Sequence, residues 1–145
     1  MIKTVAGDIF KSEAECIVNP VNCVGAMGKG LALKFKKKYP KMFFDYVMRC
    51  EKGQVKIGQP YLYKTEYRLI LNFPTKQHWI DPSKLEYIEE GLKYFAQNYR
   101  TWEITSIAFP KLGCGCGGLD WEKDVKPLMY KYLGNLEDIT VYLYE

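Results

Sequence analysis

The segment spanning residues 17–40 places the tightest limits on how this chain can fold. It begins with the β-branched residues of a short strand, continues through a loop that contains Gly25, Gly28 and Gly30, and ends in a lysine-rich helix that Pro40 terminates. A strand, a glycine loop and a helix N-terminus in this order present backbone N–H groups and a positive helix dipole to an anion. The pattern therefore predicts an α/β unit whose loop either binds a phosphate or makes a tight β–α turn.

Length and composition indicate a single globular domain over residues 1–145. Of the 145 residues, 48% are apolar and 26% charged, which is enough for one hydrophobic core. No apolar run reaches about 18 residues and no secretory signal opens the chain, so we expect no membrane contact. A set of five scattered cysteines and a single histidine predict a reducing cytoplasm, no metal site and no cofactor; the cysteines are Cys16, Cys23, Cys50, Cys114 and Cys116.

The positive charge of the chain is modest, +4, but uneven. It concentrates in the predicted helix that follows the first glycine loop and in the exit from that helix, at Lys34, Lys36, Lys37, Lys38 and Lys41. Such a cluster is either a solvated helix face or a positive flank that draws a polyanion such as a nucleic acid strand towards a neighbouring cleft.

Alternating strand and helix patterns predict a three-layer α/β/α fold with a mixed sheet of about six strands. Ser83 and Glu86 form a capping box for the best-marked helix, and Asp124 is the expected cap of the last one, because Pro127 is tolerated in a first turn. The expected strands cover residues 2–6, 16–19, 61–64, 67–72, 104–110 and 139–144, and the expected helices cover about 30–39, 43–53, 83–99 and 124–134.

A second glycine loop follows the strand expected at residues 104–110. Gly113, Gly115, Gly117 and Gly118 fall within six residues, which leaves a string of backbone N–H groups free to wrap around an anion. The spacing fits neither a Walker loop nor the dinucleotide-binding fingerprint. Two such loops after strands of one sheet would meet at the same edge and could hold a diphosphate between them, although a bulged turn is the simpler alternative.

The segment at residues 72–79 is expected to be a polar loop at a strand end, where functional residues tend to lie on an α/β scaffold. It contains an isolated lysine, Lys76, and the single histidine, His78. A solvated loop lysine is the ordinary interpretation of Lys76, and His78 is as readily a packed, structural residue as a proton shuttle.

Taken together, these motifs resemble a macrodomain, the fold that binds ADP-ribose. The resemblance extends over essentially the whole chain and rests on Gly7-Asp8, on Val18-Asn19-Pro20-Val21-Asn22 and on the two glycine loops. Residues 21–32, 73–79 and 117–121 are further similar to the antitoxin macrodomains that reverse ADP-ribosylation of thymidine in DNA, a group related to terminal ADP-ribose protein glycohydrolase.

The resemblance implies a role for each part of the site. Asp8 would hold the adenine amine with Ile9 beside it, Tyr144 would pack on the adenine, and Lys76 matches the catalytic lysine of the family. The distal ribose would lie against Asn22, Gly25, Ala26, Met27, Gly28, Lys29 and Gly30. The diphosphate would lie against Gly113, Cys114, Gly115, Cys116, Gly117, Gly118 and Leu119.

The expected reaction is cleavage of a ribosyl bond through an oxocarbenium-like centre, which needs a nearby nucleophile or proton donor. A lysine serves as either once its pKa falls from about 10.4 by desolvation or a neighbouring cation. The protein glycohydrolase relative pairs its lysine with an aspartate in the second loop, where this chain has Gly117; Asp120 lies three residues further on. The sequence therefore leaves a carboxylate partner for Lys76 unassigned.

The resemblance implies ADP-ribose and ADP-ribosylated single-stranded DNA as ligands, a cognate ADP-ribosyltransferase toxin as partner, and a monomeric cytoplasmic protein. Three alternatives stay open: hydrolysis of ADP-ribose 1″-phosphate or of glutamate-linked ADP-ribose, a non-catalytic ADP-ribose reader, and a domain that binds only nucleic acid. The acceptor, and whether the chain is part of a longer antitoxin, do not follow from the residues.

Overall fold

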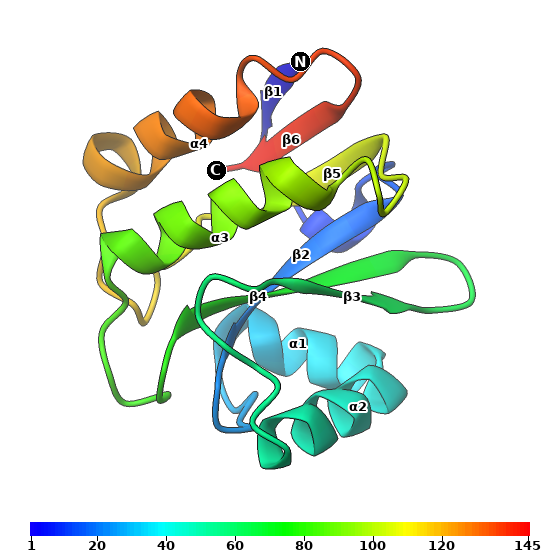
Figure 1. The fold of residues 1–145 in the computed structure, drawn as a ribbon, viewed down its shortest axis with the longest axis vertical. Helices are drawn as coiled ribbons and strands as arrows, with labels where there is room; N and C mark the ends of the chain where they lie inside the picture. The colour runs from blue at the N-terminus through cyan, green and yellow to red at the C-terminus, as the bar shows by residue number, and fades with distance from the viewer.

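The computed structural model describes all residues, 1–145, and contains one six-stranded sheet (Figure 1). Five strands run parallel, and the edge strand β3 is antiparallel to its neighbour β4. The mixed sheet is therefore as predicted. In spatial order the strands are β1 (Ile2–Val5), β6 (Thr140–Tyr144), β5 (Ser106–Phe109), β2 (Cys16–Asn22), β4 (Leu69–Lys76) and β3 (Tyr61–Lys64).

Helices cover both faces of the sheet, which gives the expected three layers (Figure 1). α3 (Leu85–Asn98) and α4 (Lys126–Leu133) bury one core against the sheet, and the predicted stripe on α3, including Ile88, Leu92 and Phe95, lies in it. α1 (Gly30–Lys38) and α2 (Pro40–Glu51) bury a second core, centred on Phe35 and Tyr46. No helix is long and apolar enough to cross a membrane.

Strand β4 is longer than predicted, and this moves Lys76 from a loop to the last position of a strand. The prediction ends the strand at residue 72 and places a polar loop after it, but β4 continues through Pro74, a residue that cannot donate an N–H group to a sheet. In the structure, β3 pairs with β4 only up to Asn72, so Pro74 lies where one side of β4 has no partner. Pro20 lies similarly in β2, beyond Ile17, the last residue paired with β5. A proline is tolerated at such one-sided positions, so both strands continue.

Two predicted helix caps are wrong. α3 begins at Leu85, after Lys84. Ser83 makes no capping hydrogen bond, and its hydroxyl is buried without any hydrogen-bond partner. Asp124 does not cap α4; instead Asp120 caps a preceding π-helical turn, η2 (Trp121–Val125), where its carboxylate accepts a hydrogen bond from the Lys123 N–H at 2.7 Å. Because η2 contains residues 121–125, α4 begins at Lys126 and Pro127 lies in its first turn.

Candidate functional site

A cavity of about 960 Å³ opens at the carboxyl edge of the sheet, between the two glycine loops. Because β2, β4, β5 and β6 are parallel there, the segments that follow them meet at this edge, as predicted. Most of the residues expected to bind a ligand line the cavity. They are Asn22, Ala26, Met27, Gly28, Lys29, Gly30, Lys76, Gly113, Cys114, Gly115, Cys116, Gly117 and Tyr144.

The side chain of Asn22 organises the first loop from within. Its Oδ1 accepts hydrogen bonds from the backbone N–H of Val24 at 3.0 Å and from the hydroxyl of Tyr46 at 2.7 Å, and its Nδ2 donates to the carbonyl oxygen of Ala26 at 2.8 Å. Only 6% of Asn22 is exposed. Its amide is thus committed to the shape of the loop, and the surface offered to a ligand comes from Ala26 to Gly30, next to the N-terminus of α1.

Gly25 is a structural residue of this loop rather than a lining one. Its φ is +85°, and a Cβ there would point at Cys50 and Val47 of α2. Gly25 is absent from the cavity wall, which includes Asn22 before it and Ala26 after it. The positive φ explains why glycine is needed at the turn.

The second loop presents residues Gly113 to Gly117 to the cavity and turns away after them. A Cβ at Gly117 would lie 2.3 Å from Ser83 Oγ and 2.4 Å from the carbonyl oxygen of Gly113, so only glycine fits. Leu119 packs on the core beneath α3 and donates its N–H to the Gly113 carbonyl at 2.9 Å. Gly118 and Leu119, both predicted ligand contacts, therefore close the loop without lining the cavity.

A smaller cavity of about 420 Å³ adjoins the first at the end of β1. Asp8, Ile9 and Tyr144 line it, as the prediction requires of an adenine site. One Asp8 oxygen accepts a hydrogen bond from the Phe10 N–H at 2.9 Å and so caps the short helix η1 (Ile9–Lys11). Because Tyr144 lines both cavities, they form one groove along the sheet edge.

Lys34 lies in the wall of the smaller cavity and is the one lysine of the α1 cluster that reaches the groove. Two others lie over aromatic rings instead: Lys36 Nζ is 4.5 Å from the ring centre of Phe43, and Lys38 Nζ is 5.1 Å from that of Phe10. Part of the lysine cluster is thus used in cation–π packing on its own domain.

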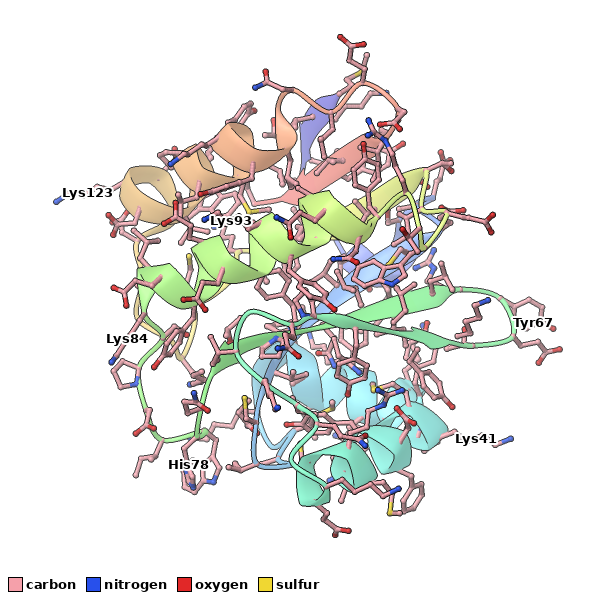
Figure 2. The ribbon with its side chains drawn as sticks, viewed as in Figure 1. Lys41, Tyr67, His78, Lys84, Lys93 and Lys123 are labelled. Carbon is pink, nitrogen blue, oxygen red and sulfur yellow. The ribbon has the colours of Figure 1, made fainter.

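Lys76 brings an ammonium group to the larger cavity. The residue is half-buried, and Nζ donates a hydrogen bond to the carbonyl oxygen of Trp79 at 3.2 Å. His78, two residues along, does not line the cavity; its Nδ1 accepts from the Ile80 N–H at 3.3 Å, and its side chain projects from the segment between β4 and α3 (Figure 2).

Sequence reasoning missed several lining residues, chiefly Thr75, Trp79, Ile80, Ser83 and Lys111. Trp79 is the last residue of the 73–79 segment and Ser83 is predicted to cap a helix, so the prediction places neither in the wall of the site. Their position in the chain could have identified them. Both residues lie in the segment that follows the strand ending at Lys76, at the edge of the sheet where the glycine loops meet.

Carboxylates are few in the groove. Asp8 lines the smaller cavity and Glu145 the larger one. Lys126 and Trp121 donate to the Glu145 side chain, and these hydrogen bonds lower the pKa of its carboxyl. Asp120 lies outside the cavity wall and is engaged as the cap of η2. No group of three or more His, Cys, Asp or Glu side chains is arranged to hold a metal ion.

The strand order, the three layers and the two glycine loops around one groove define an α/β domain with a ligand site at the carboxyl edge of its sheet. The chain belongs to the Macro domain family, which matches residues 18–128. This confirms the family resemblance found in the motifs.

Within this family the chain is similar to DarG macrodomains. The macrodomain of Mycobacterium tuberculosis DarG superposes with a TM-score of 0.96 at 44% identity, over 99% of this chain and 97% of that one. A Thermus aquaticus relative named DNA ADP-ribosyl glycohydrolase is 44% identical over 149 residues, 100% of this chain and 41% of the relative. The chain thus spans about two fifths of that curated relative.

Three further matches broaden the comparison. A Thermosipho africanus protein named DNA ADP-ribosyl transferase-DNA ADP-ribosyl glycohydrolase fusion protein is 40% identical over 98% of this chain and 42% of its own length. Thermosipho africanus DarTG in complex with ADP-ribose superposes with a TM-score of 0.90 at 40% identity, over 98% of this chain and 41% of that one. Human ADP-ribose glycohydrolase OARD1 is more distant, 29% identical over 83% of this chain and 77% of its own length.

Proposed function

We propose that this chain binds ADP-ribose and hydrolyses the bond that joins it to the nucleobase of a thymidine in single-stranded DNA. The observation that carries the proposal is the position of Lys76, a residue that lines the wide cavity between the two glycine loops and whose Nζ donates to the carbonyl oxygen of Trp79. The names of the relatives from Thermus aquaticus and Thermosipho africanus, DNA ADP-ribosyl glycohydrolase in each case, support the same activity.

In this proposal ADP-ribose lies along the groove with its adenine between Asp8 and Tyr144. The diphosphate lies against the second loop, from Gly113 to Gly117, where backbone N–H groups are the donors. The distal ribose then reaches the Ala26–Gly30 wall and the N-terminus of α1, whose dipole favours an electron-rich ligand. This order brings the scissile bond to the end of the groove where Lys76 lies.

The chemistry proposed for Lys76 is direct participation at the distal ribose. In one route the protonated amine donates a proton to the departing base while water attacks the anomeric carbon. In the other, the neutral amine attacks the anomeric carbon and the base leaves with the electrons of the glycosidic bond; the ribose ring opens to a Schiff base, which water hydrolyses to release ADP-ribose and the free amine. The carbonyl of Trp79 holds Nζ at 3.2 Å and thereby fixes its direction in the cavity. Asp120 is already engaged as a helix cap, so we do not assign it as a carboxylate partner.

The partners and the setting of the whole protein are part of the proposal. The fused Thermosipho africanus relative supports an ADP-ribosyltransferase toxin as the cognate partner of this chain. We also propose that residues 1–145 act as one monomeric domain. All five cysteines are free thiols, which suits a reducing cytoplasm.

A single-stranded oligonucleotide that carries ADP-ribosylated thymidine tests the proposal directly. The wild-type chain is expected to release ADP-ribose, and Lys76→Ala is expected to be inactive while both proteins bind free ADP-ribose in a calorimeter. Equal turnover by both proteins would contradict the role of Lys76. Binding without turnover by the wild type, on this and on glutamate-linked or 1″-phosphate substrates, would make the chain a reader.

A further inference from the structure

Two large apolar side chains lie exposed at the mouth of the larger cavity. Trp79 is 55% exposed and Ile80 is 70% exposed, and both line the cavity that contains Lys76. They follow Lys76 by three and four residues. Adjacent exposed apolar groups at the rim of a ligand cavity mark a surface that a ligand covers.

The backbone that carries these side chains is held by a local set of hydrogen bonds. The Asp81 N–H donates to the carbonyl oxygen of His78 at 3.1 Å, and the Ile80 N–H donates to His78 Nδ1 at 3.3 Å. Lys76 Nζ reaches the Trp79 carbonyl, and the imidazole and indole ring centres are 5.2 Å apart at 38°. The indole is therefore presented from a defined turn, with His78 beside it.

The acceptor of the ADP-ribosyl group has to leave the groove at this turn. If ADP-ribose occupies the groove as proposed, the bond to its acceptor lies at Lys76, and whatever is attached continues outwards past Trp79. This step rests on the proposed function. With ADP-ribose in this position, the nucleotides that neighbour the modified thymidine lie over the exposed indole of Trp79.

Charge and aromatic chemistry favour a nucleic acid strand over an apolar protein segment here. Lys29, Lys76 and Lys111 line the cavity, and its single acidic wall residue, Glu145, is paired with Lys126. The cavity wall thus contains three lysines and one paired carboxylate together with an exposed indole. Proteins that bind single strands combine positive grooves with aromatic side chains, and stacking on one base contributes about 1–3 kcal/mol.

We propose that Trp79, with Ile80 beside it, is the acceptor platform of the site: the indole stacks on a base adjacent to the ADP-ribosylated thymidine. The platform would make an oligonucleotide a better substrate than the isolated ADP-ribosylated nucleoside. It is a specificity surface for the strand and takes no part in bond cleavage.

The test compares two substrates, ADP-ribosylated thymidine alone and the same nucleoside within a single-stranded oligonucleotide. Trp79→Ala is expected to raise KM for the oligonucleotide by about 5- to 150-fold, the equivalent of one stacked base. The nucleoside KM and the Kd of free ADP-ribose are expected to stay the same, and Trp79→Phe is expected to restore most of the loss. The control is Tyr67→Ala, at a residue 91% exposed in the turn between β3 and β4 and far from His78 (Figure 2).

Two outcomes would overturn the platform. An equal loss on both substrates, or weaker binding of free ADP-ribose, would make Trp79 a cover over ADP-ribose itself. An unchanged KM for both substrates would mean that Trp79 and Ile80 contact something other than the strand, such as a protein partner or a second copy of the chain. A binding experiment tests the platform even if no turnover is found. It compares the affinity of the Lys76→Ala variant for the modified oligonucleotide with that of the Lys76→Ala/Trp79→Ala double variant. Weaker binding by the double variant supports the platform, and identical affinities contradict it.

Discussion

The backbone N–H of Ser83 donates a hydrogen bond to the carbonyl oxygen of Gly117 at 3.0 Å, and this bond ties the start of α3 to the second glycine loop. The Ser83 hydroxyl is buried against the same glycine and has no hydrogen-bond partner. The loop is thus fixed from behind by an element of the core, while its other side faces the groove.

Gly117→Ala is expected to disrupt the loop and weaken ADP-ribose binding at least about tenfold. A Cβ would meet the Gly113 carbonyl oxygen at 2.4 Å and Ser83 Oγ at 2.3 Å, and overpacking of this kind costs about 1–3 kcal/mol. Calorimetry with ADP-ribose and the urea midpoint measure the two effects. Gly115→Ala is the matched control for the urea midpoint, because a Cβ there meets no protein atom within 4 Å. Adding Ser83→Ala is not expected to rescue Gly117→Ala, since the clash with the carbonyl remains; full recovery would contradict this account.

The variant Lys76→Arg distinguishes the positive charge of Lys76 from its ability to transfer a proton or form a Schiff base. Arginine keeps the positive charge but does not deprotonate in proteins and forms no Schiff base under these conditions. We expect the loss of kcat to equal that of Lys76→Ala, about 10²- to 10⁴-fold for a general acid or base, with little change in ADP-ribose affinity. Release of ADP-ribose from the modified oligonucleotide under single turnover is the measurement. Substantial activity in Lys76→Arg would show that only a positive charge is needed there.

Cys116 is expected to be the most reactive thiol, and ADP-ribose is expected to protect it. It is exposed and lines the cavity, whereas burial raises the pKa of the Cys114 thiol to about 11 and raises the pKa of the fully buried Cys16 still further. Alkylation by iodoacetamide at pH 8, followed by peptide mass spectrometry, gives the order of labelling. Faster labelling of Cys114, or a Cys116 rate unaffected by ADP-ribose, would argue against the proposed position of the ligand.

Asp138 is expected to make folding stability sensitive to acid. Hydrogen bonds from Arg100, at 2.7 Å, and from Tyr99 lower the pKa of its carboxyl from 3.8 to about 2. Because the folded-state pKa is the lower one, the stabilisation is fully present above about pH 4 and is lost as the pH falls through 2. Asp138→Asn should flatten this fall in urea midpoints between pH 4 and pH 2. Glu137→Gln, at an exposed neighbour without an ion pair, serves as the control and should leave the fall intact.

The fold class could be predicted because its signals are local and repeated. The stripe of Ile88, Leu92 and Phe95 specifies a helix that buries one face, and the apolar run that became β5 specifies a strand covered on both sides. Two of the differences from the prediction concern residues whose local rule is overridden by a neighbour in space. Pro74 stays in β4 because β3 has already ended, and Ser83 fails to cap α3 because it packs against Gly117.

The sequence by itself determined the alternation of strands and helices, the two glycine loops and the presence of an isolated lysine near a strand end. Periodicity and backbone freedom are properties of short segments, so they can be recognised without a structure. Tertiary structure alone decided which glycines line the groove, that Asn22 is committed to its own loop, that Asp120 is a helix cap, and that Trp79 stands exposed beside Lys76. Each of these depends on which atoms of distant segments meet at the carboxyl edge of the sheet, and spacing along the chain does not contain that information.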